Sequence, residues 1–157
     1  MKLYVISDTH GQIDNAIKFY NKQSSVDLII HLGDMERDAR KISDSTGQTV
    51  ISVRGNNEAF SSKPDFHVLQ TEYGDIFLTH GHMQSVKRDL QKLVYRAQEL
   101  GCKAALFGHT HIPIFAEANG IYLLNPGSLT FPPPGSSGSY AIVNISENDF
   151  SASIFYS

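Results

Sequence analysis

The chain has 157 residues, enough for a substantial buried core, and we expect a single domain over residues 1–157. Its 41% hydrophobic and 18% charged residues are ordinary for a globular protein, and a formal net charge of −3 does not favour a nucleic-acid partner. No apolar run approaches the roughly 20 residues of a membrane span, no secretory signal is recognisable, and the lone Cys102 cannot form an intrachain disulfide, so we expect a cytoplasmic protein without a membrane partner.

Short β-prone runs alternate with helical patterns through the first two thirds of the chain. Residues 27–32 are nearly all apolar, as in a strand that is covered on both faces, and a Gly at position 74 indicates a hairpin. The strands predicted in this part are residues 2–6, 27–32, 49–53, 66–73, 75–79 and 103–107. The predicted helices are residues 13–20, 36–43 and 86–100, the last with the clearest amphipathic pattern.

After residue 107 the helical patterns cease. The remaining runs predict successive strands at residues 114–118, 121–124, 139–145 and 150–156. An α/β front half followed by a mostly β rear half predicts an α/β fold in which two facing sheets carry helices on their outer faces.

Ligand-type residues follow five of these strands directly. They are Asp8 and His10, then Asp34, Asn56, His80, and finally His109 and His111. Sites in open α/β sheets gather outside the carboxyl ends of the strands, so these side chains should converge. Each motif alone is also ordinary turn chemistry, but five in order, each at a strand end, favour a site.

The chemistry of this set favours metal binding. Two Asp, one Asn and four His are too many ligands for one small cation, but they suit two. Oxygen and imidazole ligands without a thiolate indicate a pair of Mn, Fe, Ni, Co or Zn ions rather than Ca or Mg alone.

These motifs resemble those of a known family. "DTHG", "GDME", "GNNE", "THGH" and "GHTHIP", in this order, are similar to the sequence blocks of the calcineurin-like metallophosphoesterases. The small size and the later "NPGS" are most similar to the compact bacterial and archaeal phosphodiesterase branch. The resemblance implies a four-layer α/β-β/α sandwich of two facing mixed β-sheets flanked by helices. It also makes a small homo-oligomer plausible.

The resemblance implies two divalent ions, with Mn favoured and Fe, Ni, Co or Zn also suitable. One ion would be held by Asp8, His10 and His111. The other would be held by Asn56, His80 and His109, and Asp34 would bridge both. The implied reaction is hydrolysis of a small-molecule phosphodiester, in which a metal-bridging hydroxide attacks phosphorus in line. The residues expected at the reacting centre are Asp34, Asn56, Asn57 and His80.

Two departures from the family pattern affect the expected activity. Asn57 stands where active branches carry a His and compact members often a Cys, and an amide cannot supply a proton. No Arg follows Ser128, so phosphate binding would depend on the metals, the Ser128 hydroxyl, backbone amides and Arg54. We therefore expect a modest phosphodiesterase that prefers aryl esters.

Two alternatives stay open. One is a non-catalytic metal-binding or scaffold protein on the same fold, as in the retromer small subunit, which also lacks the His that Asn57 replaces. The other is a nuclease, which the negative net charge of the chain disfavours.

Overall fold

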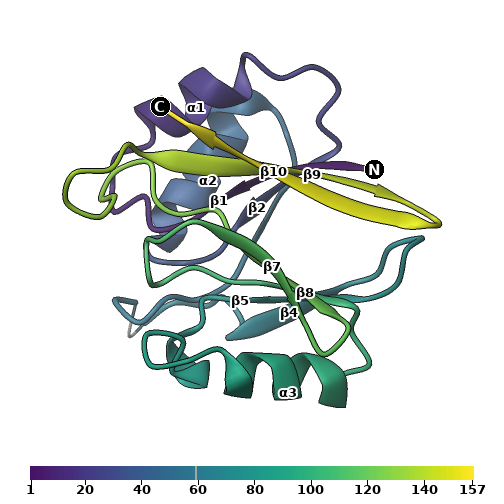
Figure 1. The fold of residues 1–157 in the computed structure, drawn as a ribbon. Helices are drawn as coiled ribbons and strands as arrows, with labels where there is room; N and C mark the ends of the chain where they lie inside the picture. The colour runs from purple at the N-terminus through teal and green to yellow at the C-terminus, as the bar shows by residue number, and fades with distance from the viewer. Residues whose placement is uncertain (59) are drawn as a thin grey trace.

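Two mixed five-stranded sheets face each other in the computed structural model, which describes residues 1–58 and 60–157 (Figure 1). The first sheet has the order β10-β9-β1-β2-β3, with β1, β2 and β3 parallel and the two late strands antiparallel. Its strands are β1 (Lys2–Ile6), β2 (Leu28–His31), β3 (Val50–Ser52), β9 (Ser139–Ser146) and β10 (Asp149–Tyr156).

The second sheet has the order β4-β5-β6-β8-β7, with a parallel centre and an antiparallel strand at each edge. Its strands are β4 (Phe66–Leu69), β5 (Ile76–Thr79), β6 (Ala104–Leu106), β7 (Ile114–Ala118) and β8 (Ile121–Asn125). Helices α1 (Asp14–Tyr20) and α2 (Glu36–Thr46) cover the first sheet, and α3 (Gln91–Glu99) covers the second (Figure 1).

The alternation of side chains along β1 shows how the layers form. Leu3 and Val5 belong to the apolar cluster between the two sheets, whereas Tyr4 and Ile6 pack towards α1 and α2. This alternation has the period of two that strand geometry imposes, and both faces are apolar because both are covered. The predicted α/β fold, a four-layer α/β-β/α sandwich of mixed sheets, is confirmed.

The third helix begins five residues later than the periodicity predicts. Val86 is buried with the α3 cluster, but it lies in a turn that follows Ser85, whose φ of 55° is left-handed. The helix starts where Asp89 Oδ1 accepts a hydrogen bond from the Gln91 amide at 3.0 Å. An apolar pattern marks which residues are buried, and a helix start depends in addition on backbone conformation and capping.

Within the described residues, no helix combines the length and the apolar character needed to cross a bilayer. The loops after β1, β2, β3, β5 and β6 carry the predicted ligand residues, so the fold brings segments of both sheets to one place.

Candidate metal centre

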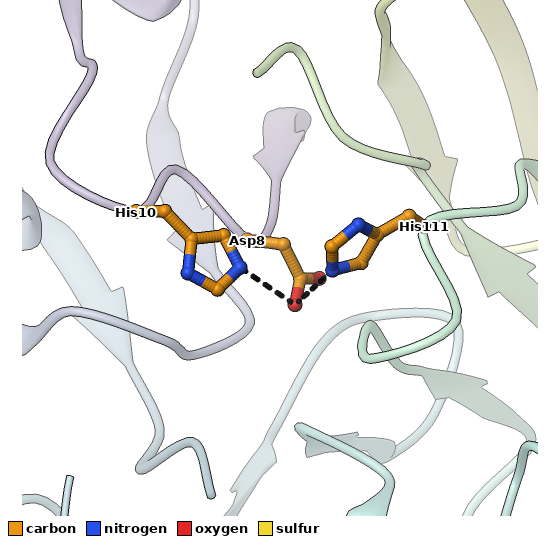
Figure 2. A group of neighbouring side chains, drawn as sticks. All are labelled: Asp8, His10 and His111. Carbon is orange, nitrogen blue, oxygen red and sulfur yellow. Dashed lines mark ion pairs between the residues drawn. The ribbon is translucent and has the colours of Figure 1, made fainter. Parts of the chain in front are cut away.

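Three side chains from two distant loops point towards one another at the end of β1. Figure 2 shows Asp8, His10 and His111, with both dashed lines meeting at one carboxylate oxygen. Asp8 Oδ1 lies 3.2 Å from His111 Nε2 and 3.9 Å from His10 Nε2. One atom from each of the three residues lies within 4.8 Å of the others, so a single cation could contact all three.

A second group gathers around His80. Its Nε2 lies 3.0 Å from Asn56 Oδ1 and 3.1 Å from His109 Nδ1. Asp34 lies between the two groups, because its Oδ2 is 3.6 Å from His80 Nε2 and 3.7 Å from His10 Nε2. The structure thus brings all seven predicted residues together, and Asp8 Oδ1 also lies 3.9 Å from His80 Nε2, so Asp8 is close to both groups.

Five of these seven residues have a left-handed backbone. The φ angles are 54° for Asp8, 46° for His10, 60° for Asp34, 67° for His109 and 60° for His111. Positive φ is uncommon for residues other than Gly, although Asp and His tolerate it better than most. Backbone strain of this kind clusters at functional sites, so its concentration here indicates a site rather than ordinary turns.

Two glycines let neighbouring loops approach the carboxylates. A Cβ on Gly55 would overlap the side chain and backbone of Asp34. A Cβ on Gly108 would overlap the Ser7 hydroxyl and lie 2.8 Å from Asp8 Oδ2. Glycine is therefore required at both positions for steric reasons, whatever the backbone angle.

Two buried polar atoms at this centre have no hydrogen-bond partner among the described residues. They are Asp8 Oδ1 and His10 Nε2. Burial without a partner is costly for a carboxylate oxygen, and a cation between the two groups would compensate both atoms. Carboxylate, amide and imidazole donors suit a borderline divalent metal, so the residues present fit such an ion.

Two of the histidines are oriented by backbone carbonyls. His80 Nδ1 donates to the Leu32 carbonyl at 2.7 Å, and His111 Nδ1 donates to the Phe131 carbonyl at 2.8 Å. Each ring therefore carries its proton on Nδ1, which leaves the Nε2 lone pair facing the centre. This arrangement is the usual support of a metal-binding histidine.

The electrostatics at Asp8 and His109 favour the protonation states that a metal needs, whereas the Asp8 carboxylate raises the pKa of His111 and so favours its protonated form. Burial favours the protonated form of Asp8, but the His111 ring, whose Nε2 lies 3.2 Å from Asp8 Oδ1, the His80 ring and a hydrogen bond from Ser7 together hold the pKa of Asp8 below its usual value. Burial, with the charges of His80 and Lys87, lowers the pKa of His109 to about 4. A carboxylate and a neutral imidazole are the forms that bind metal.

The loop that carries Asp8 and His10 rests on a buried polar chain. The Gly33 amide donates to His31 Nδ1 at 3.3 Å, so His31 Nε2 carries the proton and faces Thr9 Oγ1 at 2.9 Å. Thr9 Oγ1 then donates to Asp38 Oδ2 at 2.6 Å, and the Gly11 amide donates to the same oxygen. His31 is thus a buried residue whose two ring nitrogens both have partners, and no local pattern in the sequence pointed to Asp38.

The "NPGS" segment acts within the protein rather than on phosphate. Ser128 is fully buried, its hydroxyl donates to the Asp8 carbonyl at 2.9 Å, and it accepts from the Phe131 amide at 2.9 Å. It also accepts from the Thr130 amide at 3.2 Å. The expectation that this hydroxyl binds phosphate is therefore wrong, because all three of its hydrogen bonds are internal. Asn125 likewise donates to the Gly108 carbonyl at 2.9 Å and holds the loop that carries His109.

The "GNNE" block braces Asp34. Asn57 donates its backbone amide to Asp34 Oδ1 at 3.2 Å and its side-chain amide to Oδ2 at 2.7 Å. Glu58 accepts from the Gly55 amide at 2.8 Å and from the Glu36 amide, so it fixes the backbone of two loops instead of touching a candidate ligand.

A small polar hollow of about 210 Å³ adjoins the centre on the Asn56 side. Arg54 and His82 line it, and Arg54 Nε donates to Asp65 Oδ1 at 2.8 Å. His82 Nδ1 is buried without a hydrogen-bond partner among the described residues, and the His82 ring centroid lies 5.4 Å from that of His80.

The fold and this cluster define a class of protein, an α/β sandwich with a candidate metal centre at its strand ends. Residues 1–148 match the model of the calcineurin-like phosphoesterase superfamily domain. The chain is 34% identical over 158 residues to the probable metallophosphoesterase YsnB of Bacillus subtilis, an alignment that covers 99% of this chain and 90% of the relative. It is 29% identical over 150 residues to the phosphodiesterase MJ0936 of Methanocaldococcus jannaschii, with 81% and 83% covered.

Solved structures agree with the sequence relatives. A Streptococcus pneumoniae protein described as a predicted phosphoesterase superposes with a TM-score of 0.83 at 28% identity, over 99% of this chain and 88% of that one. Zinc-bound Vps29 of Entamoeba histolytica superposes with a TM-score of 0.84 at 22% identity, over 99% and 92%, a likeness of fold alone. The chain belongs to the calcineurin-like phosphoesterase superfamily, a family of metallophosphoesterases.

Proposed function

We propose that this protein is a phosphodiesterase that uses two divalent cations. Asp8, His10 and His111 would hold one, and Asn56, His80 and His109 the other, with Asp34 bridging them. The observation that supports this most is the pair of buried atoms without a hydrogen-bond partner, Asp8 Oδ1 and His10 Nε2, which face the other ligand atoms.

Bound cations of this kind supply a hydroxide for in-line attack on phosphorus and neutralise charge on the phosphate oxygens. The protein's own residues would do the rest. Asp34 is held by two donors of Asn57, which keeps its carboxylate between the two groups. The His80 and His111 rings are locked by carbonyls and need no reorientation. His82 and Arg54 lie in the hollow beside Asn56, where an ester group of the substrate would enter.

A diester is a better match for this site than a monoester. A phosphodiester carries one negative charge and a monoester close to two, and no Arg follows Ser128 to meet the second. Asn57 cannot protonate a departing alkoxide, so esters with good leaving groups, such as aryl esters, should react fastest. The phosphodiesterases MJ0936 of Methanocaldococcus jannaschii and YfcE of Escherichia coli, both relatives, support this substrate class. Mn is the metal we favour, and Fe, Ni, Co and Zn suit the same ligands.

Hydrolysis of bis(p-nitrophenyl) phosphate and p-nitrophenyl phosphate by the metal-free protein, with and without added Mn²⁺, tests this function. We expect Mn-dependent hydrolysis that favours the diester, and a loss of at least about 10²-fold in Asp34→Asn, because the bridging charge is removed. Asp44→Asn, an exposed position of α2, is the matched control and should keep wild-type activity.

The opposite result would be a folded protein that stays inactive with Mn, Fe, Ni, Co and Zn in turn. That result would reject the enzyme and favour a scaffold on the same fold. A calorimetric titration that found only one bound ion would reject the two-cation centre alone.

A further inference from the structure

Phe131 lies at the edge of the candidate metal centre, in the loop that follows Ser128. Its ring meets the His10 ring edge to face, with centroids 5.2 Å apart and an angle of 74° between the planes. The side chain is nevertheless 49% exposed. One side of the ring thus contacts a candidate metal ligand, and much of the rest is open to solvent beside it.

The backbone of Phe131 is held on both sides. Its amide donates to Ser128 Oγ at 2.9 Å, and its carbonyl accepts from His111 Nδ1 at 2.8 Å. Pro132 follows, and the residue before a proline has restricted backbone angles. The ring cannot swing away with its backbone unless the bond that orients His111 breaks. A half-exposed aromatic side chain on a fixed backbone has only two χ angles to immobilise, so it loses little conformational entropy when a ligand packs against it.

The two flanks of the centre differ in chemistry. On the Asn56 side lies the small polar hollow with Arg54 and His82, about 210 Å³ in volume. On the His10 and His111 side stands the uncharged ring of Phe131. A phosphodiester bound at the centre carries two ester groups, which must leave the phosphorus in different directions. A polar flank and an aromatic flank suit a diester whose two ester groups are unlike.

We propose that Phe131 is a specificity-determining residue that packs against an aromatic ester group of the substrate. The substrate class is a phosphodiester with at least one aryl or other flat aromatic substituent. Aromatic rings packed in this way gain about 0.5–1.5 kcal/mol beyond their area, roughly 2- to 13-fold in affinity. The assignment rests on the proposed phosphodiesterase function, since it supposes that a diester binds at this centre.

Competitive inhibition measures the contribution of the ring. Diphenyl phosphate and diethyl phosphate carry the same charge and differ in aromatic character, and each is tested against bis(p-nitrophenyl) phosphate hydrolysis by the Mn-loaded protein. We expect Phe131→Ala to raise the inhibition constant of diphenyl phosphate roughly 3- to 10-fold and that of diethyl phosphate less than about twofold. Phe131→Tyr should restore the preference. Phe155→Ala, which removes a 42% exposed ring on β10, should leave both inhibition constants unchanged.

Two results would overturn the assignment. If the ratio of the two inhibition constants is the same in Phe131→Ala and the wild type, the ring does not select aromatic groups. If both inhibition constants rise by the same factor and the affinity for Mn also falls, Phe131 acts only by holding His10 in place. Failure of the proposed function is recognised separately, as no Mn-dependent hydrolysis by the wild type. In that case, calorimetric titration of the two diesters into the Mn-loaded wild-type and Phe131→Ala proteins gives the same ratio directly.

Discussion

Asn57 shows how one side chain can support a site and limit its chemistry. Its two amide donors bind both oxygens of Asp34, so it stabilises the carboxylate that we place between the cations. An amide does not ionise near neutral pH and cannot give a proton to a departing alkoxide. The enzyme that we propose would therefore depend on the acidity of its leaving group.

Replacing Asn57 by His should restore a proton donor. For a series of aryl methyl phosphates, we expect Asn57→His to raise kcat most for the least acidic leaving groups, by up to about 10²-fold for phenol. The gain in kcat should nearly vanish for the p-nitrophenyl ester, because p-nitrophenolate departs readily without being protonated. Asn57→Gln, which has an amide but no titratable group, is the control. Equal gains across the series would show that the histidine acts on binding rather than on the leaving group.

At the scale of elements, loops carry the candidate ligands and a helix supports one of them. Asp38 of α2 reaches across to the loop between β1 and α1, where it accepts from Thr9 Oγ1 and from the Gly11 amide. Thr9 sits between Asp8 and His10, both with a left-handed backbone. The hydrogen bonds of Asp38 therefore hold the loop in a conformation that is unfavourable by itself.

Removing the Asp38 carboxylate should release this loop. We expect Asp38→Ala to lower the free energy of unfolding by about 2–4 kcal/mol, since the buried Thr9 hydroxyl and the part-buried Gly11 hydrogen bond lose their acceptor. Mn affinity should fall by about tenfold or more, as for other residues that orient ligands. Urea denaturation and calorimetric titration measure the two effects, with the exposed Asp44→Ala of the same helix as control. Unchanged Mn affinity would mean that the loop holds its shape without Asp38.

For the molecule as a whole, burial of His31 links stability to pH. Burial lowers the pKa of His31, and the nearby charges of Asp38, Asp8 and Glu58 oppose this only in part. The unfolded chain then binds a proton more readily than the folded one. Stability is therefore retained above the unfolded pKa near 6.5 and lost as pH falls from there towards the folded value.

The wild-type protein in EDTA should thus have a lower urea midpoint at pH 5 than at pH 7. His31→Gln, which cannot be protonated, should show a smaller fall between the same two pH values, whatever its absolute stability. Equal falls in the two proteins would mean that protonation of His31 does not contribute to the loss of stability in this range.

The candidate centre also depends on the packing of the two sheets. The first sheet contributes the loops with Asp8, His10, Asp34 and Asn56, and the second contributes those with His80, His109 and His111. Leu3 and Val5 of β1 pack in the same apolar cluster as Leu106 of β6, directly before the loops that carry ligands from each sheet. The packing of this cluster therefore sets how the loops of the two sheets meet at the centre.

The sequence by itself determined the features that are local or repeated along the chain. Apolar periodicity located the strands, and each predicted ligand could be recognised because it follows a strand directly. The order of the five motifs identified the family and, through it, the four-layer fold, and it predicts the grouping of the seven residues around two ions.

Only the tertiary structure decided which polar groups make hydrogen bonds inside the protein and which remain available to bind a ligand. Ser128 looked available for phosphate, yet its hydroxyl holds the Asp8 carbonyl, 120 positions away in the chain. Asp38 and Phe131 carried no local signal, because their partners come from other segments. The reason is physical: burial and periodicity act over a few neighbouring residues, whereas hydrogen bonds and ring contacts form between whichever segments the folded chain brings together.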